Sequence, residues 1–193
     1  MDNSLVVRLR QMTGAGMMDC KAAMEEAGGD IEAAAEMLRK KGIAKAAKSG
    51  ERETREGIVA IYVHSTKKMA AMVELLCETD FVARNRDFQS LANDIAMHIA
   101  ATSPLYLSPD SVPQEVLDKE REIYLEEFSG SGKPGDIIDK IIDGKFSKYY
   151  EDVCLLNQKF VKDEDMTVGE LIKQKIGVIG ENIRVGRFAR FEV

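Results

Sequence analysis

Ile58-Val59-Ala60-Ile61-Tyr62-Val63 is a run rich in β-branched residues, and a second apolar run at residues 69–77 follows it after the polar segment Ser65-Thr66-Lys67-Lys68. β-branched and aromatic residues favour strands, and two such runs around a short polar segment are typical of a β-hairpin. Near the end of the chain, residues 183–192 alternate well enough to predict a further strand. Together these segments predict a small antiparallel sheet.

Helices are predicted on both sides of these strands. Residues 88–99 carry apolar side chains at helical spacing, so they predict an amphipathic helix that ends before Pro104. Thr167-Val168-Gly169-Glu170 has the spacing of a capping box, which predicts the start of another helix. Gly177 is expected to end that helix.

Residues 113–150 predict two helices joined by a turn. Pro113 suits the first position of one helix, Pro134 starts the second, and Gly130-Ser131-Gly132-Lys133 forms the turn between them. The apolar stripe along these helices is narrow, which suits a protruding antiparallel coiled coil better than a buried pair.

The first 42 residues predict three short helices. Gly28-Gly29 ends the second helix, Asp30 caps the third, and Gly42 is expected to close the third. The polar stretch at residues 40–53 is interpreted as a partly helical linker. The buried stripe of the second helix has the spacing i, i+3, i+4, i+7 and consists of Cys20, Ala23, Met24 and Ala27.

The fold class predicted from these elements is α+β, in two parts. Residues 1–48 are expected to form a three-helix module, similar to a ubiquitin-associated (UBA) domain, with its linker. Residues 49–193 are expected to form a core and dimerisation domain, in which helices pack on the small antiparallel sheet and the helical hairpin at residues 113–150 protrudes.

The composition is that of a soluble globular protein, with 45% hydrophobic and 31% charged residues. There is no Trp, and aromatic residues make up only 6%, so the core must rest on Ala, Val, Ile, Leu and Met. The formal net charge is -6, and a domain-wide basic footprint is absent. We therefore expect a protein or small-molecule partner and no direct contact with nucleic acid.

The N-terminus Met1-Asp2-Asn3-Ser4 lacks the basic segment and apolar run of a signal peptide, and no stretch is apolar enough to span a membrane. The three cysteines form no CxxC pair, which argues against zinc or thioredoxin chemistry. A reducing cytoplasm is the expected compartment, with no membrane partner.

Enzyme motifs are nearly absent. Gly14-Ala15-Gly16 is not a dinucleotide loop, because the third glycine would fall at Asp19, and the chain has no phosphate-binding GxxxxGK[ST]. A Cys77–His98 dyad is the one candidate for nucleophilic chemistry. A cysteine in an apolar strand usually belongs to the core, and His98 fits a polar face or a hydrogen-bonded core position. We expect a binding protein that is not an enzyme and has no catalytic residue, metal or cofactor.

Several motifs, in the right order along the whole chain, resemble the elongation factor Ts family. They are Thr13-Gly14-Ala15-Gly16-Met17-Met18-Asp19-Cys20-Lys21-Ala22-Ala23, Leu38-Arg39-Lys40-Lys41-Gly42, Glu78-Thr79-Asp80-Phe81-Val82-Ala83-Arg84-Asn85, Ile95-Ala96-Met97-His98-Ile99-Ala100-Ala101 and Ser131-Gly132-Lys133-Pro134. Long family members carry two related halves in the core. Here a segment with the strands of the second half is missing, so the chain resembles a short form.

The resemblance implies a translation factor that promotes guanine-nucleotide exchange on elongation factor Tu. The N-terminal module would dock on the G domain of that partner through Arg10, Met17 and Met18, and His98 matches another docking position. Thr79-Asp80-Phe81-Val82 matches the segment that intrudes beside the nucleotide and dislodges Mg²⁺.

Other interpretations of these residues stay open at the level of sequence. Met17 and Met18 can simply pack the module, and Asp80 and Phe81 can be an N-cap and a core aromatic. A UBA-type scaffold for some other protein and a cysteine hydrolase using Cys77 are the alternative functions. Because a small sheet with exposed faces and edges invites pairing, we also expect a homodimer.

Overall fold

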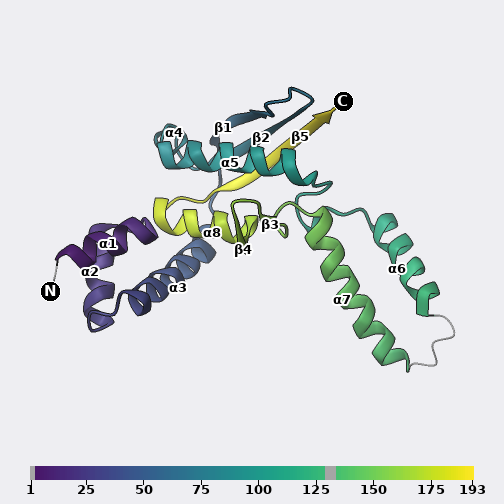
Figure 1. Cartoon of the computed structure of the whole chain (residues 1–193), viewed down its shortest axis with the longest axis horizontal. Coiled ribbons are helices and arrows are strands. Elements are labelled where there is room, and N and C mark those ends of the chain that lie inside the picture. The colour runs from purple at the N-terminus through teal and green to yellow at the C-terminus, as the bar shows by residue number, and fades with distance from the viewer. Residues whose placement is uncertain (1–2, 129–133) are drawn as a thin grey trace. The chain divides into compact units, whose positions relative to one another are not determined.

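The computed structural model describes residues 3–128 and 134–193 (Figure 1). The chain divides into two compact units, one made of Met1–Met97 with Glu170–Val193 and the other of His98–Gly169. The domain boundary expected after residue 48 stays a prediction. The turn expected at residues 130–133 lies outside the described residues.

Three helices begin the first unit: α1 (Asn3–Thr13), α2 (Met17–Glu26) and α3 (Ile31–Ser49). Asp30 caps α3, because its carboxylate accepts hydrogen bonds from the backbone N–H groups of Glu32 at 2.9 Å and Ala33 at 3.2 Å. The three helices share one apolar core and are consistent with a UBA-like module. That core consists of Val6, Leu9, Cys20, Ala23, Met24 and Ala34.

Two predicted helix ends are wrong, and they have one cause. Helix α3 continues through Gly42 to Ser49, and helix α8 (Val168–Ile179) continues through Gly177. The two glycines lie against each other: a Cβ atom placed on Gly177 would lie 2.7 Å from the Cα atom of Gly42. Glycine at these positions lets two helix backbones approach closely and does not end either helix.

The predicted hairpin and final strand are confirmed. Strands β1 (Glu56–Val63), β2 (Met69–Cys77) and β5 (Arg184–Glu192) form an antiparallel sheet in the order β1-β2-β5. Helix α5 (Arg86–Thr102) follows and ends before Pro104, as expected. One face of the sheet and the apolar stripe of α5 are buried in the core, as Ala71, Val73, Leu75, Phe88, Leu91 and Ile95 illustrate.

The second unit contains the two expected helices, α6 (Gln114–Phe128) and α7 (Gly135–Val153), preceded by the 3-10 turn η1 (Pro109–Ser111). The rings of Tyr124 and Phe146 meet edge to face at 5.4 Å, and Lys145 forms an ion pair with Glu127 at 2.6 Å. A small two-stranded sheet of β3 (Lys159–Phe160) and β4 (Asp163–Thr167) was not predicted.

Candidate partner-binding site

The segment after β2 presents an aromatic side chain to solvent. Thr79 caps the one-turn helix α4 (Asp80–Ala83), because its hydroxyl oxygen accepts a hydrogen bond from the backbone N–H of Val82 at 3.4 Å. Phe81 follows in the first turn and is 80% exposed. Phe81 therefore lies at the surface, as a segment that enters a partner must, and the alternative of a core aromatic is wrong. The cap is Thr79, whereas the N-cap alternative had named Asp80.

Asp80 lies beside Phe81 and is held by an ion pair. One of its carboxylate oxygens lies 3.0 Å from a guanidinium nitrogen of Arg84, one turn further along the chain. An exposed pair of this kind contributes little stability, so its main effect is to restrict the orientation of the Asp80 side chain. The β2–α4 turn therefore carries a carboxylate and an exposed aromatic ring at consecutive positions.

The predicted docking residues of the N-terminal helices are exposed. Met18 is 75% exposed, Met17 is also exposed, and Arg10 points to solvent on α1. The core of the three helices uses Met24 instead. The alternative that Met17 and Met18 merely pack the module is therefore wrong, although their docking role stays a prediction.

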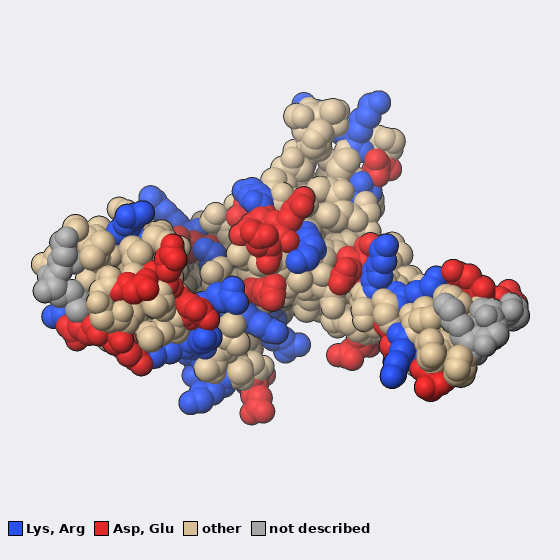
Figure 2. All heavy atoms as spheres, turned by 60° about the horizontal axis from the view of Figure 1, so that its bottom comes forward, with Lys and Arg blue, Asp and Glu red and all other residues tan. Residues whose placement is uncertain are grey.

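Charged side chains of both signs are intermixed over the face drawn in Figure 2. Within the described residues, no helix is both long and apolar enough to cross a membrane.

His98 is fully buried, in contrast to the other predicted docking residues. Its Nδ1 atom accepts a hydrogen bond from the backbone N–H of Val161 at 3.3 Å, so its Nε2–H donates to the side-chain oxygen of Gln158 at 3.0 Å. Burial of the ring lowers the pKa of His98 below its ordinary value of 6.5. The docking role of His98 stays a prediction, and it would require the Val161 segment to move.

The buried imidazole predicts a pH-dependent stability. Below pH 6.5 the unfolded chain binds a proton at His98 that the folded chain, with its lowered pKa, does not bind, so the free energy of unfolding falls as the pH drops below 6.5. We expect chemical denaturation at about pH 7.5 and about pH 5.5 to show this loss, and a His98→Gln variant to show a flatter dependence.

The histidines can also be observed directly, since the chain has only two of them. In an NMR titration, the ring resonance that is missing from a His64→Asn variant belongs to His64, and the remaining one belongs to His98. A His98 ring that titrates at or above pH 6.5 in the folded chain would contradict the assigned hydrogen bonds.

The structure disfavours the cysteine hydrolase. The Cys77 thiol is buried, and it donates a hydrogen bond to the backbone carbonyl of Thr79 at 3.2 Å. Burial raises the pKa of Cys77 to about 11, so the reactive thiolate is scarce at neutral pH. Because both ring nitrogens of His98 already have partners, that histidine is also not free to act as a base.

The outer face of the three-stranded sheet is apolar and exposed. Val59, Ile61 and Val63 of β1 lie beside Met72 of β2, which pairs with Ile61, and Phe191 of β5 pairs with Ala70. Glu74 and Arg187, at one end of the face, form an ion pair. The sheet is buried on one side only.

Exposed methionines on α2, an exposed aromatic at a capped turn and a buried Cys77 are typical of a protein-binding factor rather than of a cysteine hydrolase. The family model described as "Elongation factor TS" matches residues 32–193. Elongation factor Ts of Thermosipho melanesiensis is 59% identical over 98% of this chain and 96% of its own length. Those of Fervidobacterium nodosum and Maridesulfovibrio salexigens are 54% and 51% identical, each over 98% of this chain and over 96% and 92% of their own lengths. The chain belongs to the elongation factor Ts family of translation elongation factors, which are exchange factors and not enzymes.

Proposed function

We propose that the chain binds elongation factor Tu·GDP and promotes GDP release through the β2–α4 turn, with Asp80 and Phe81 entering beside the nucleotide and Thr79 and Val82 framing them. The observation that carries this proposal is the exposed Phe81 on a capped turn. Leaving a Phe side chain in water forgoes about 1.5–3 kcal/mol of burial, which a pocket on the partner would recover.

The physical step is the loss of Mg²⁺ from the partner. A GTP-binding protein holds its nucleotide through backbone amides, a P-loop lysine and Mg²⁺ that bridges the phosphate oxygens. An aromatic side chain that displaces the elements supporting Mg²⁺ weakens the hold on GDP. Because linkage is reciprocal, bound nucleotide lowers the affinity of the partner for the exchange factor by the same amount that the factor lowers the affinity for nucleotide. Binding of GTP therefore releases the factor.

The N-terminal module, residues 1–48, supplies docking affinity to the G domain in this proposal. Arg10, Met17 and Met18 are exposed on α1 and α2, and the flexible, polarizable thioether of Met adapts to a partner surface. Docking and exchange are then carried by separate segments of the chain.

The proposal is tested by mixing the chain with elongation factor Tu carrying fluorescent GDP and excess unlabelled GTP. The wild-type chain should accelerate the loss of fluorescence. An Arg10→Ala, Met18→Ala double variant should need about tenfold or more chain for half-maximal acceleration, with an unchanged maximal rate, because it loses docking contacts only. A wild-type chain that leaves GDP release at its spontaneous rate would refute the proposed function.

A homodimer is part of the proposal, and the outer face of the three-stranded sheet is its contact surface. Apolar side chains from all three strands line this face, and the charges of Glu74 and Arg187 on it are paired with each other. Contiguous apolar patches of this kind mark interaction sites, and a two-fold axis lets one apolar face cover an identical one. A second copy of this chain is therefore the occupant. The helices α6 and α7 are proposed to pack against each other as an antiparallel coiled coil.

Ile61→Asp should turn the dimer into a monomer. Ile61 is 60% exposed in the middle of β1, so aspartate is tolerated in the free chain. In the dimer it would be buried without a partner, which costs about 3 kcal/mol and raises the dissociation constant about a hundredfold. Light scattering at micromolar concentration should give twice 21.4 kDa for the wild type and 21.4 kDa for the variant.

Leu105→Asp is the matched control, because Leu105 is 66% exposed and lies outside the sheet. It should remain dimeric. A wild-type mass of 21.4 kDa under the same conditions would exclude the dimer.

A further inference from the structure

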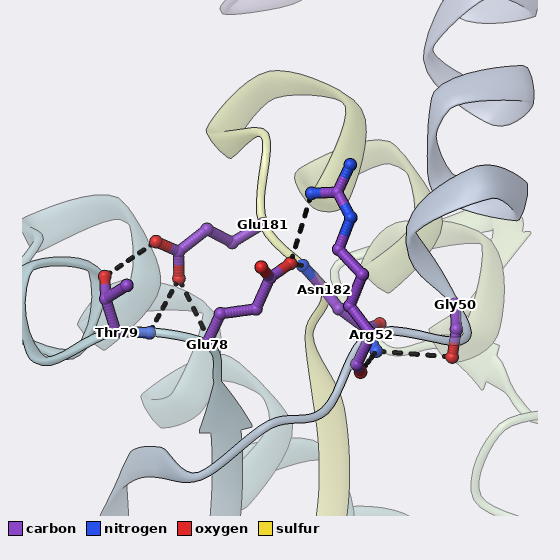
Figure 3. A network of polar contacts seen from close by, with 6 residues as sticks. All are labelled: Gly50, Arg52, Glu78, Thr79, Glu181 and Asn182. Atoms are coloured by element: carbon purple, nitrogen blue, oxygen red, sulfur yellow. Dashed lines mark hydrogen bonds and ion pairs between the residues drawn. The ribbon is translucent and has the colours of Figure 1, made fainter.

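The turn that carries Phe81 is held by a carboxylate from a distant part of the sequence (Figure 3). Glu181 lies between α8 and β5, and one of its oxygens accepts hydrogen bonds from the backbone N–H groups of Glu78 at 3.1 Å and Thr79 at 3.0 Å. Its other oxygen accepts a hydrogen bond from the Thr79 hydroxyl at 2.6 Å. The carboxylate thus satisfies three donors at the point where β2 ends and α4 begins.

The hydroxyl of Thr79 has two roles in this arrangement. It donates its proton to Glu181 and accepts a hydrogen bond from the Val82 N–H. The direction of the hydroxyl, and therefore of the one-turn helix that it caps, is set by the carboxylate. Asp80 and Phe81 lie between Thr79 and Val82, so their orientation depends on the same contact.

The next residue, Asn182, fixes this corner to the segment that follows α3. Asn182 is buried, and its side-chain amide donates to the carbonyls of Gly50 at 3.3 Å and Arg52 at 2.7 Å. Its backbone N–H donates to the Glu78 carboxylate at 2.6 Å, and that carboxylate also lies 3.4 Å from the Arg52 guanidinium. The residue that follows Glu181 is therefore fixed both to the segment after α3 and to the end of β2.

We infer that Glu181 is a positioning residue for nucleotide exchange: it touches neither partner nor nucleotide and acts by holding the Thr79 cap so that Asp80 and Phe81 are presented in one orientation. Hydrogen bonds to an ionised carboxylate are about twice as strong as neutral ones, which suits a contact that must fix a short exposed turn. The inference rests on the proposed exchange function.

The test compares Glu181→Ala and Glu181→Gln with the wild-type chain in the exchange assay. Glu181→Ala should lower the maximal rate of GDP release about tenfold, because three hydrogen bonds to a charged group are lost. The concentration for half-maximal exchange should change little, since the docking helices are untouched. Glu181→Gln keeps an acceptor and should restore part of the rate. Glu127→Gln, which removes an exposed carboxylate of α6 that pairs with Lys145, should leave the rate unchanged.

Two further readouts separate positioning from a general loss of structure. Amide hydrogen exchange at Glu78 and Thr79 should accelerate in Glu181→Ala, while amides in the middle of β2 remain protected. In an Asp80→Ala, Phe81→Ala background, Glu181→Ala should have no further effect on the rate, because both residues that it positions are gone.

Unchanged hydrogen-exchange protection at Thr79, or an equal loss of nucleotide-exchange rate with and without Asp80 and Phe81, overturns the inference. If Phe81→Ala loses stimulated GDP release and Glu181→Ala keeps the wild-type rate, only this inference fails. If Phe81→Ala itself keeps the wild-type rate, the proposed function fails.

Discussion

Phe81→Ala should slow stimulated GDP release by about 30-fold or more while the free chain melts at the wild-type temperature. Truncating a central aromatic side chain at an interface typically costs about 2 kcal/mol or more of interaction free energy. A loss of about 2 kcal/mol in the transition state corresponds to about a 30-fold change in rate. Phe81 is 80% exposed in the free chain, so its removal leaves no cavity and changes the free energy of unfolding by about 0.5 kcal/mol at most.

Phe88→Ala is the matched control for this experiment. Phe88 lies seven positions further on, in α5, and is fully buried. Truncating a core Phe costs about 3–5 kcal/mol, so this variant should lose thermal stability and keep its exchange rate where it remains folded. The two phenylalanines should therefore show opposite patterns of melting and exchange.

The result that contradicts the mechanism is a Phe81→Ala chain with normal exchange at low temperature and a much lower melting temperature. Asp80→Ala gives an independent measurement on the same turn. The Asp80–Arg84 ion pair is exposed and contributes about 0–1 kcal/mol, so this variant should also melt normally and lose exchange.

Local patterns were sufficient to predict the strands β1, β2 and β5 and most of the helices. Two apolar runs around a polar segment predicted the β1–β2 hairpin, and the alternation of apolar and polar residues predicted β5. Both patterns are typical of a half-buried sheet. For Phe81 the local sequence was ambiguous: the strand end before it and the polar residues after it indicated exposure, but only the family resemblance weighed against a core aromatic.

What could not be predicted depends on contacts between residues far apart in the sequence. Glu181 lies 102 positions from Thr79, and no local pattern connects the two. The burial of His98 depends likewise on Gln158, 60 positions away. The strands β3 and β4 are too short and too polar to give a periodic signal. A glycine in an amphipathic segment is equally ambiguous, because the same residue type ends helices and lets them cross.

Gly177→Ala should destabilise the chain, whereas Gly42→Ala should stabilise it or leave it unchanged. A Cβ atom on residue 177 would meet the Cα atom of Gly42 at 2.7 Å and its carbonyl carbon and oxygen at 3.1 Å, so backbone has to shift. A Cβ atom on residue 42 would meet only the Cα atom of Gly177, at an ordinary 3.8 Å. Overpacking of this kind costs about 1–3 kcal/mol.

The comparison isolates the contact, because both substitutions replace glycine by alanine within a helix. Each gains up to about 1 kcal/mol of helix propensity, and this gain largely cancels between the two variants. Their free energies of unfolding should therefore differ by about 1–3 kcal/mol, measured by chemical denaturation with an unchanged dependence on denaturant. Equal stabilities would show that α3 and α8 do not meet at these glycines in solution, and the explanation of why both helices continue past them would be lost.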